Sequence, residues 1–146
     1  CAIGKGMVLM TLSENVSDEQ RDAFCTLMEH AGRFDEVDEG MMDAGGVVAG
    51  CTPAWAYRFI EGLADGAVAA GLPRKKAMKY AAQAVLGAAA MCLTEGAHPG
   101  PLKDAVCSPG GSTIAGVHAL ERAGVRGAAM DAVTAAFEKT KQMAKG

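Results

Sequence analysis

The sequence contains no glycine-rich dinucleotide-binding fingerprint, which would read G-x-G-x-x-G after a strand, with an acidic residue about 20 positions further on. Gly4-Lys5-Gly6 and Gly45-Gly46 do not have that spacing. No apolar run approaches the roughly 18–20 residues of a membrane span, and no basic-then-apolar leader opens the chain. We therefore expect these 146 residues to bind no dinucleotide by themselves and not to enter a membrane.

Aromatic residues and net charge are also scarce. Only 5% of the residues are aromatic while 50% are hydrophobic, so the core must be built from small aliphatic side chains. A net charge of −3 gives no electrostatic reason to expect nucleic acid or an anionic lipid surface as a partner.

The five cysteines form no C-x-x-C pair and are odd in number: Cys1, Cys25, Cys51, Cys92 and Cys107. That pattern favours neither a zinc site nor a disulfide framework, and free thiols in a reducing cytoplasm fit it better. The three histidines lie on separate predicted elements, so we also expect no metal site. Cys107 has no basic neighbour nearer than Lys103, which argues against a nucleophilic role.

Residues 1–38 predict a strand, a helix and a second strand. The apolar run at 7–12 has the length of a buried strand. A capping box from Ser17 to Gln20 then predicts a helix that Gly32 ends, and residues 33–38 alternate like a short strand. A unit of this size cannot bury its apolar face alone, so it must pack on something else.

From Glu39 onward the pattern is helical, and the fold is predicted to be mainly α with about six helices. Cys51-Thr52-Pro53 is expected to interrupt the first helical stretch, since proline suits the start of a new helix. The expected helices are 40–50, 53–71, 74–95, 99–107, 113–123 and 126–143.

The stretch from Ala81 to Leu93 contains no charge, and Gln83 is its only polar residue. A helix that is apolar on every side must be enclosed on every side. A single layer of short neighbours can hardly do this, which favours an intertwined homodimer over a monomeric bundle with an apolar central helix.

The segment from Cys107 to Gly116 combines a glycine turn with three hydroxyls at the start of a helix. Glycines let a ligand approach the main chain, and the free amides at a helix N-terminus attract an anion such as a carboxylate. The alternative is an ordinary helix cap after a turn, because serine and threonine are common N-caps.

The segment Ser108-Pro109-Gly110-Gly111-Ser112-Thr113-Ile114-Ala115-Gly116 resembles the signature of pyrroline-5-carboxylate reductase. The resemblance extends in the same order over nearly the whole chain. The other matching segments are Glu14-Asn15-Val16-Ser17, Met42-Asp43-Ala44, Gly62–Gly66, Gly71–Arg74, Ala82–Ala89, His98-Pro99, Ala119–Glu121 and Gly124–Gly127.

The resemblance implies an enzyme that performs the NAD(P)H-dependent last step of proline synthesis. It implies that residues 1–38 are the end of a Rossmann-type nucleotide-binding domain, and that 39–146 form an intertwined helical dimerisation and substrate-binding domain. The start at Cys1 is typical of a fragment or processed product. NADP or NAD would be bound by the absent N-terminal domain, and this chain would be inactive alone.

The resemblance also implies the site residues. Ser108 and the backbone amides of Gly110, Gly111 and Ser112 would hold the substrate carboxylate, and Thr113 would direct its hydroxyl at the ring nitrogen. The stretch 49–54 matches the family only at Gly50, Pro53 and Ala54, so we interpret it as a structural turn.

Two other functions stay open. The chain could be a non-catalytic dimerisation module from a truncated paralogue, or it could act on another cyclic imine acid. The sequence does not distinguish NADH from NADPH, the ring size of the substrate, or an oligomer larger than a dimer.

Overall fold

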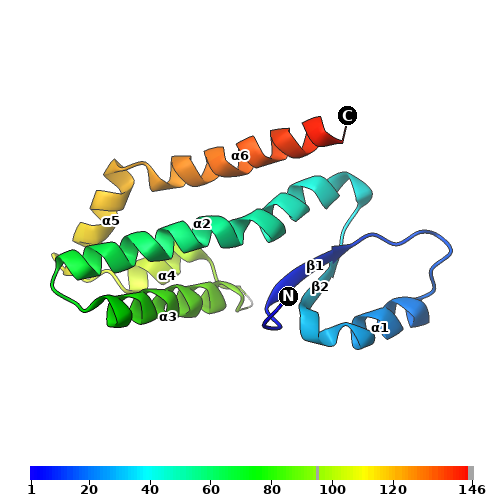
Figure 1. Ribbon diagram of the computed structural model, residues 1–146, viewed down its shortest axis with the longest axis horizontal. Helices are drawn as coiled ribbons and strands as arrows, with labels where there is room; N and C mark the ends of the chain where they lie inside the picture. Colours follow the sequence, from blue (N-terminus) through cyan, green and yellow to red (C-terminus); the bar gives the residue numbers. More distant parts are fainter. Residues whose placement is uncertain (95, 145–146) are drawn as a thin grey trace. The chain divides into compact units, whose positions relative to one another are not determined.

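The computed structural model describes residues 1–94 and 96–144. A two-stranded sheet and short helices come first, and long helices follow (Figure 1). In chain order the elements are β1 (Gly6–Met10), α1 (Asp18–Leu27), η1 (Glu29–Ala31), β2 (Gly32–Glu36), η2 (Glu39–Met41), α2 (Met42–Ala69), α3 (Arg74–Cys92), α4 (Pro99–Ala105), α5 (Ser112–Arg122) and α6 (Val125–Met143). The expected mainly α fold with a small strand–helix–strand piece is confirmed.

The chain forms two compact units. The first unit contains Cys1–Ala54 together with the chain from Met130 onward, and the second contains Trp55–Ala129. The first therefore holds the sheet and α1, whereas the second holds α3, α4 and α5. The glycine loop lies entirely within the second unit.

In the first unit, β1 and β2 pair in parallel, with Gly6 opposite Gly32. The predicted capping box starts α1, since the Ser17 hydroxyl accepts from the Gln20 N–H and the Gln20 side chain accepts from the Ser17 N–H. The prediction that Gly32 ends this helix is wrong, because α1 stops at Leu27 and Gly32 begins β2. A Cβ at Gly32 would overlap the backbone of Gly6, so this glycine permits the close approach of the strands.

The expected break at Cys51-Thr52-Pro53 is also wrong, because α2 runs unbroken through it as one helix of 28 residues (Figure 1). Pro53 lacks an N–H, so the Ala49 carbonyl loses its usual i+4 donor. A proline in a helix interior costs about 3 kcal/mol, and this cost is outweighed when helix on both sides is stabilised by packing. The stretch 49–54 is therefore helix and not a turn.

In the second unit, α2 and α3 form a hairpin whose contacts are small side chains. Ala64, Ala77 and Ala81 are buried, with Ile60, Ala67, Val68 and Leu72 packed against them. The C-terminus of α2 forms a Schellman motif. The Leu72 N–H donates to the Ala67 carbonyl and the Gly71 N–H donates to the Val68 carbonyl, each at 2.9 Å.

The charge-free part of α3 is poorly covered within this chain. Its exposed apolar side chains include Leu86 at 56% and Met91 at 52% of their full surface, and Leu93 just beyond the helix at 63%. The helix ends at Cys92. Glu95, where the sequence predicted its end, lies outside the described residues. Several large apolar side chains exposed on one helix favour an interaction surface.

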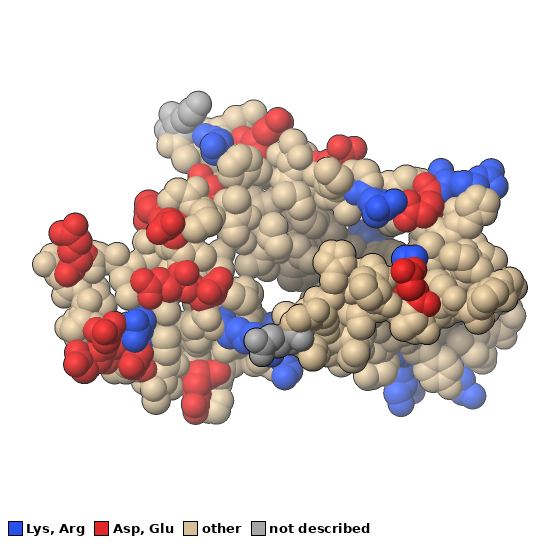
Figure 2. Space-filling model, turned by 180° about the vertical axis from the view of Figure 1, so that it is seen from behind, with Lys and Arg blue, Asp and Glu red and all other residues tan. Residues whose placement is uncertain are grey.

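Charge is unevenly distributed along the chain. The first 54 residues carry ten acidic and three basic side chains, whereas the remaining residues carry seven acidic and eleven basic ones. On the face shown in Figure 2, acidic side chains gather on the left, where α1 and the two strands lie. An anionic ligand is therefore disfavoured near the sheet and favoured on the later helices. Among the described helices, none combines the length and the apolar character needed to cross a bilayer.

Candidate functional site

The glycine loop between α4 and α5 forms a tight turn. The Gly111 N–H donates to the Ser108 carbonyl at 3.0 Å, which closes a four-residue turn. Pro109 occupies the second position, and Gly110 occupies the third with a φ of +67°. Proline followed by a residue with positive φ is the pattern of a type II turn, and glycine is favoured at that third position. The turn leads directly into α5.

The N-terminus of α5 has no cap of its own. Gly111 is the N-cap residue, with φ −76° and ψ 168°, and no side chain in the described part of the chain caps the helix. The first amides of a helix have no carbonyl partner within it, so those of Ser112 and Thr113 remain available. The alternative that the hydroxyls of this loop serve as helix caps is therefore not what the structure shows. An anion can use these amides and the positive end of the helix dipole.

The predicted site residues are brought together in one short segment. Ser108 and the two glycines form the turn, and Ser112 and Thr113 begin α5. Apart from the half-buried Gly111, these residues are exposed in the single chain. Small-molecule sites usually bury most of their ligand, so other surfaces must cover this loop for it to enclose a substrate.

The neighbouring helix α4 begins differently. His98 is its N-cap residue, and Nδ1 of His98 accepts from the Gly100 N–H at 3.1 Å. His98 therefore caps α4, which starts at Pro99 as the sequence predicted. A hydrogen bond from Lys103 to Asp104 and the charge of that carboxylate raise the pKa of Lys103.

A pocket of about 700 Å³ adjoins α4, α5 and the start of α6. Its walls are His98, Pro99, Gly100, Lys103, Val117, Glu121 and Arg126. Glu121 accepts from Arg126 at 2.8 Å, and Lys103 donates to Asp104, so the three charged residues of this pocket are already paired. The pocket contains no residue of the glycine loop. Because its charged side chains are already in ion pairs, this pocket is a poorer anion site than the start of α5.

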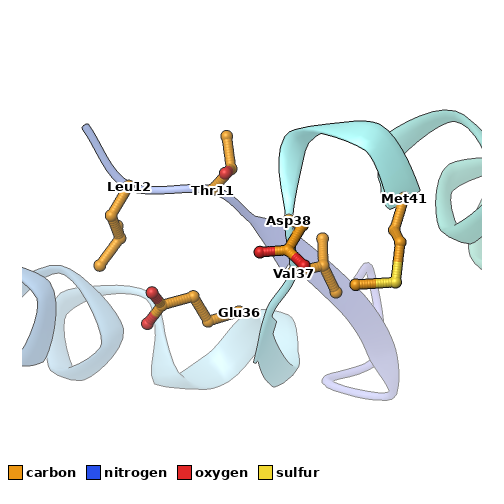
Figure 3. Close-up of a pocket in the computed structure, with 6 residues that line it drawn as sticks. All are labelled: Thr11, Leu12, Glu36, Val37, Asp38 and Met41. Atoms are coloured by element: carbon orange, nitrogen blue, oxygen red, sulfur yellow. The ribbon is translucent and has the colours of Figure 1, made fainter. Parts of the chain in front are cut away.

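A second pocket, of about 310 Å³, lies at the carboxyl ends of β1 and β2 (Figure 3). It is lined by Thr11, Leu12, Glu36, Val37, Asp38 and Met41. Sequence reasoning missed it, although polar residues directly after parallel strands are a known signal for a ligand site. Glu36 and Asp38 give it negative charge, so it repels carboxylates and phosphates.

Metal ligands and cysteines are the other groups that the sequence offers for chemistry. Residues 1–94 and 96–144 hold no group of three or more His, Cys, Asp or Glu side chains arranged around a metal ion. The cysteines are present as free thiols, and Cys107, next to the loop, is half-buried. The uncapped start of α5 is thus the candidate site that the geometry favours.

Known proteins resemble the chain over almost its full length. The family described as pyrroline-5-carboxylate reductase dimerisation matches residues 39–143. A pyrroline-5-carboxylate reductase of Pisum sativum is 45% identical over 142 residues, which are 97% of this chain and 52% of the relative. A pyrroline-5-carboxylate reductase of Escherichia coli (strain K12) is 41% identical over 143 residues, which are 98% of this chain and 53% of the relative.

The fold comparison points the same way. The crystal structure of a Plasmodium falciparum pyrroline carboxylate reductase with NADP bound superposes with a TM-score of 0.86 at 33% identity. That match covers 97% of this chain and 54% of the solved one. The chain spans about half the length of the curated relatives it matches.

Proposed function

Because the chain belongs to the pyrroline-5-carboxylate reductase family by its dimerisation domain, we propose that it is the C-terminal part of such an enzyme. The reaction adds a hydride to the carbon and a proton to the nitrogen of a cyclic C=N bond. The coenzyme supplies the hydride, and the protein supplies orientation and electrostatics. The observation that carries the proposal is the uncapped N-terminus of α5 behind a type II turn.

The loop would hold the substrate by its carboxylate. The amides of Ser112 and Thr113 and the Ser108 hydroxyl are donors of the kind that bind an oxyanion. The Gly111 amide, which the resemblance also implies, already donates to the Ser108 carbonyl in this structure. Once the carboxylate is fixed, the ring lies beside the first turn of α5. The Thr113 hydroxyl would then hydrogen-bond the ring nitrogen and favour the charge distribution that makes the neighbouring carbon accept hydride.

The described residues do not fit the coenzyme. The chain has no glycine fingerprint before a helix, and the pocket at the ends of the strands carries Glu36 and Asp38. Both carboxylates would repel a pyrophosphate. We therefore place NADP or NAD binding in a domain outside these 146 residues. This placement predicts that the chain alone reduces nothing.

A homodimer belongs to the same proposal. The matching family model is that of a dimerisation domain, and large apolar side chains of α3 are exposed in a single chain. A second copy of α2, α3 and their neighbours would cover that surface. A non-catalytic dimerisation module is the alternative that the same exposed surface supports.

The test compares this chain joined to a family nucleotide-binding domain with the chain alone. We expect the joined protein to oxidise NAD(P)H when pyrroline-5-carboxylate is added, and the chain alone to bind no NADPH. Ultracentrifugation of the chain alone measures its assembly. A dimeric protein with no turnover in the joined form would favour the non-catalytic module, and NADPH binding by these 146 residues would contradict the placement of the coenzyme.

A further inference from the structure

The two glycines of the loop differ in what their missing side chain permits. Gly110 has a φ of +67°, and a Cβ there would meet no atom within 4 Å. Gly111 has φ −76° and ψ 168°, which any residue adopts without strain. Gly110 is therefore required by its backbone conformation, whereas Gly111 is not.

Gly111 is required by space. A Cβ there would overlap the Oγ atom of Ser108, and it would lie 3.1 Å from the Ser108 carbonyl oxygen and 3.6 Å from the Ser108 Cβ. The Ser108 side chain thus occupies the volume that a residue-111 side chain would fill. Gly111 is also the N-cap residue of α5, so the Ser108 hydroxyl lies beside the uncapped end of that helix.

We propose that Gly111 is a positioning residue, whose missing side chain seats the Ser108 hydroxyl beside the α5 amides so that hydroxyl and amides bind one carboxylate together. The inference rests on the proposed function and goes beyond it, because it assigns Gly111 an effect that acts through Ser108. Alanine at position 111 has allowed backbone angles there, although its Cβ would also lie a close 3.1 Å from the Ser108 carbonyl oxygen. It would push the hydroxyl out of the position from which it donates to the carboxylate.

The test is a double-mutant cycle in the complete enzyme, with this chain joined to its coenzyme-binding half. The variants are Ser108→Ala, Gly111→Ala and the double variant. Each single change should remove one hydrogen bond to the charged carboxylate. We therefore expect each to raise KM for pyrroline-5-carboxylate about tenfold, with kcat changing less. The double variant should be no worse than Ser108→Ala, since the overlapping Oγ atom is already gone.

A substrate without the carboxylate separates positioning from general damage. For the wild type and each variant, kcat/KM is measured with pyrroline-5-carboxylate and with 1-pyrroline. We expect Gly111→Ala to lower the preference for the carboxylated imine about tenfold. Gly110→Ala is the matched control, because it strains the backbone and does not touch Ser108. It should lower the melting temperature more than Gly111→Ala does.

The outcomes are distinct. A double variant about 100-fold worse than wild type, or equal losses on both substrates, would show that Gly111 does not act through Ser108. A Gly111→Ala variant with unchanged preference would overturn the inference while leaving the proposed function intact. No turnover by the wild type would refute the proposed function, and the inference with it.

Discussion

Helices α4 and α5 follow each other in the same compact unit, but their N-termini are treated in opposite ways. At α4, His98 accepts from the Gly100 N–H, and Pro99 at the first position removes one amide that would need a partner. At α5, the N-cap is a glycine with no side chain to offer, and the first position is Ser112 with its amide intact.

The contrast is consistent with a structural start at α4 and the proposed binding start at α5. The missing cap alone does not mark a site, because α3, which follows Pro73, also has no side-chain cap. Uncapped amides cost stability unless water or a ligand satisfies them. The N-terminus of α5 has no capping hydrogen bond from a side chain, whereas His98 caps α4 and the Ser17–Gln20 capping box caps α1. An uncapped end preceded by a turn that presents Ser108 is consistent with a ligand completing the cap.

The largest effect is expected from removing the Thr113 hydroxyl. Thr113→Ala should lower kcat for pyrroline-5-carboxylate about 100-fold, the lower part of the range for a positioned hydrogen-bond or proton donor. KM should change less, because the carboxylate contacts remain. Thr113→Ser, which keeps the hydroxyl, is the matched control in the same steady-state assay. Wild-type kcat in Thr113→Ala would remove this residue from the reaction.

The next variant makes α5 begin as α4 does. Ser112→Pro removes one amide donor at the first helical position, where proline is tolerated, and Gly111 already has the extended geometry that precedes a proline. We expect kcat/KM to fall about 20-fold, the worth of one hydrogen bond to a charged group. Far-UV circular dichroism should stay unchanged.

Ser112→Ala controls for the hydroxyl, since it keeps the amide. A loss equal to that of Ser112→Pro would assign the effect to the side chain and would contradict an amide cradle.

The converse change removes the side-chain cap of α4. His98→Ala removes the acceptor for the Gly100 N–H and should lower the free energy of unfolding by about 1 kcal/mol. His98→Asn supplies another side-chain acceptor and should restore most of the loss. Denaturant titration measures both variants. If His98→Ala were as stable as the wild type, the contrast between α4 and α5 would have no energetic basis.

The smallest effect is expected at α1. Ser17→Ala removes half of an exposed capping box whose Gln20 N–H to Ser17 Oγ distance is a long 3.3 Å. The free energy of unfolding should fall by about 0.5 kcal/mol, the low end for such caps. The same denaturant titration detects it. A larger loss than that of His98→Ala would mean that the α1 cap, and not the α4 cap, is the stronger of the two.

Local sequence rules predicted most helix starts and failed at the proline inside α2. The capping box at Ser17, the helix end near Gly71 and the helix start at Pro99 are short-range features, and each appears close to where the sequence places it. Cys51-Thr52-Pro53 was expected to interrupt a helix, because proline suits the start of a new one. The structure continues α2 through Pro53, although a proline inside a helix costs about 3 kcal/mol.

For the site, the sequence predicted which residues lie in the loop but not how their side chains and backbone contact one another. Ser108, Gly110 and Gly111 were recognisable as a turn before a helix. That Gly111 makes room for Ser108 depends on the rotamer of that serine, which no spacing rule contains. The pocket beside Glu36 and Asp38 was missed because strand ends meet only in three dimensions.

The most direct test is the crystal structure of the complete enzyme with L-proline bound. We expect the proline carboxylate within about 2.7–3.2 Å of the Ser112 and Thr113 amides and the Ser108 hydroxyl. The ring nitrogen should lie beside the Thr113 hydroxyl. A carboxylate bound away from the start of α5, with those amides in contact only with water, would contradict the proposed binding mode.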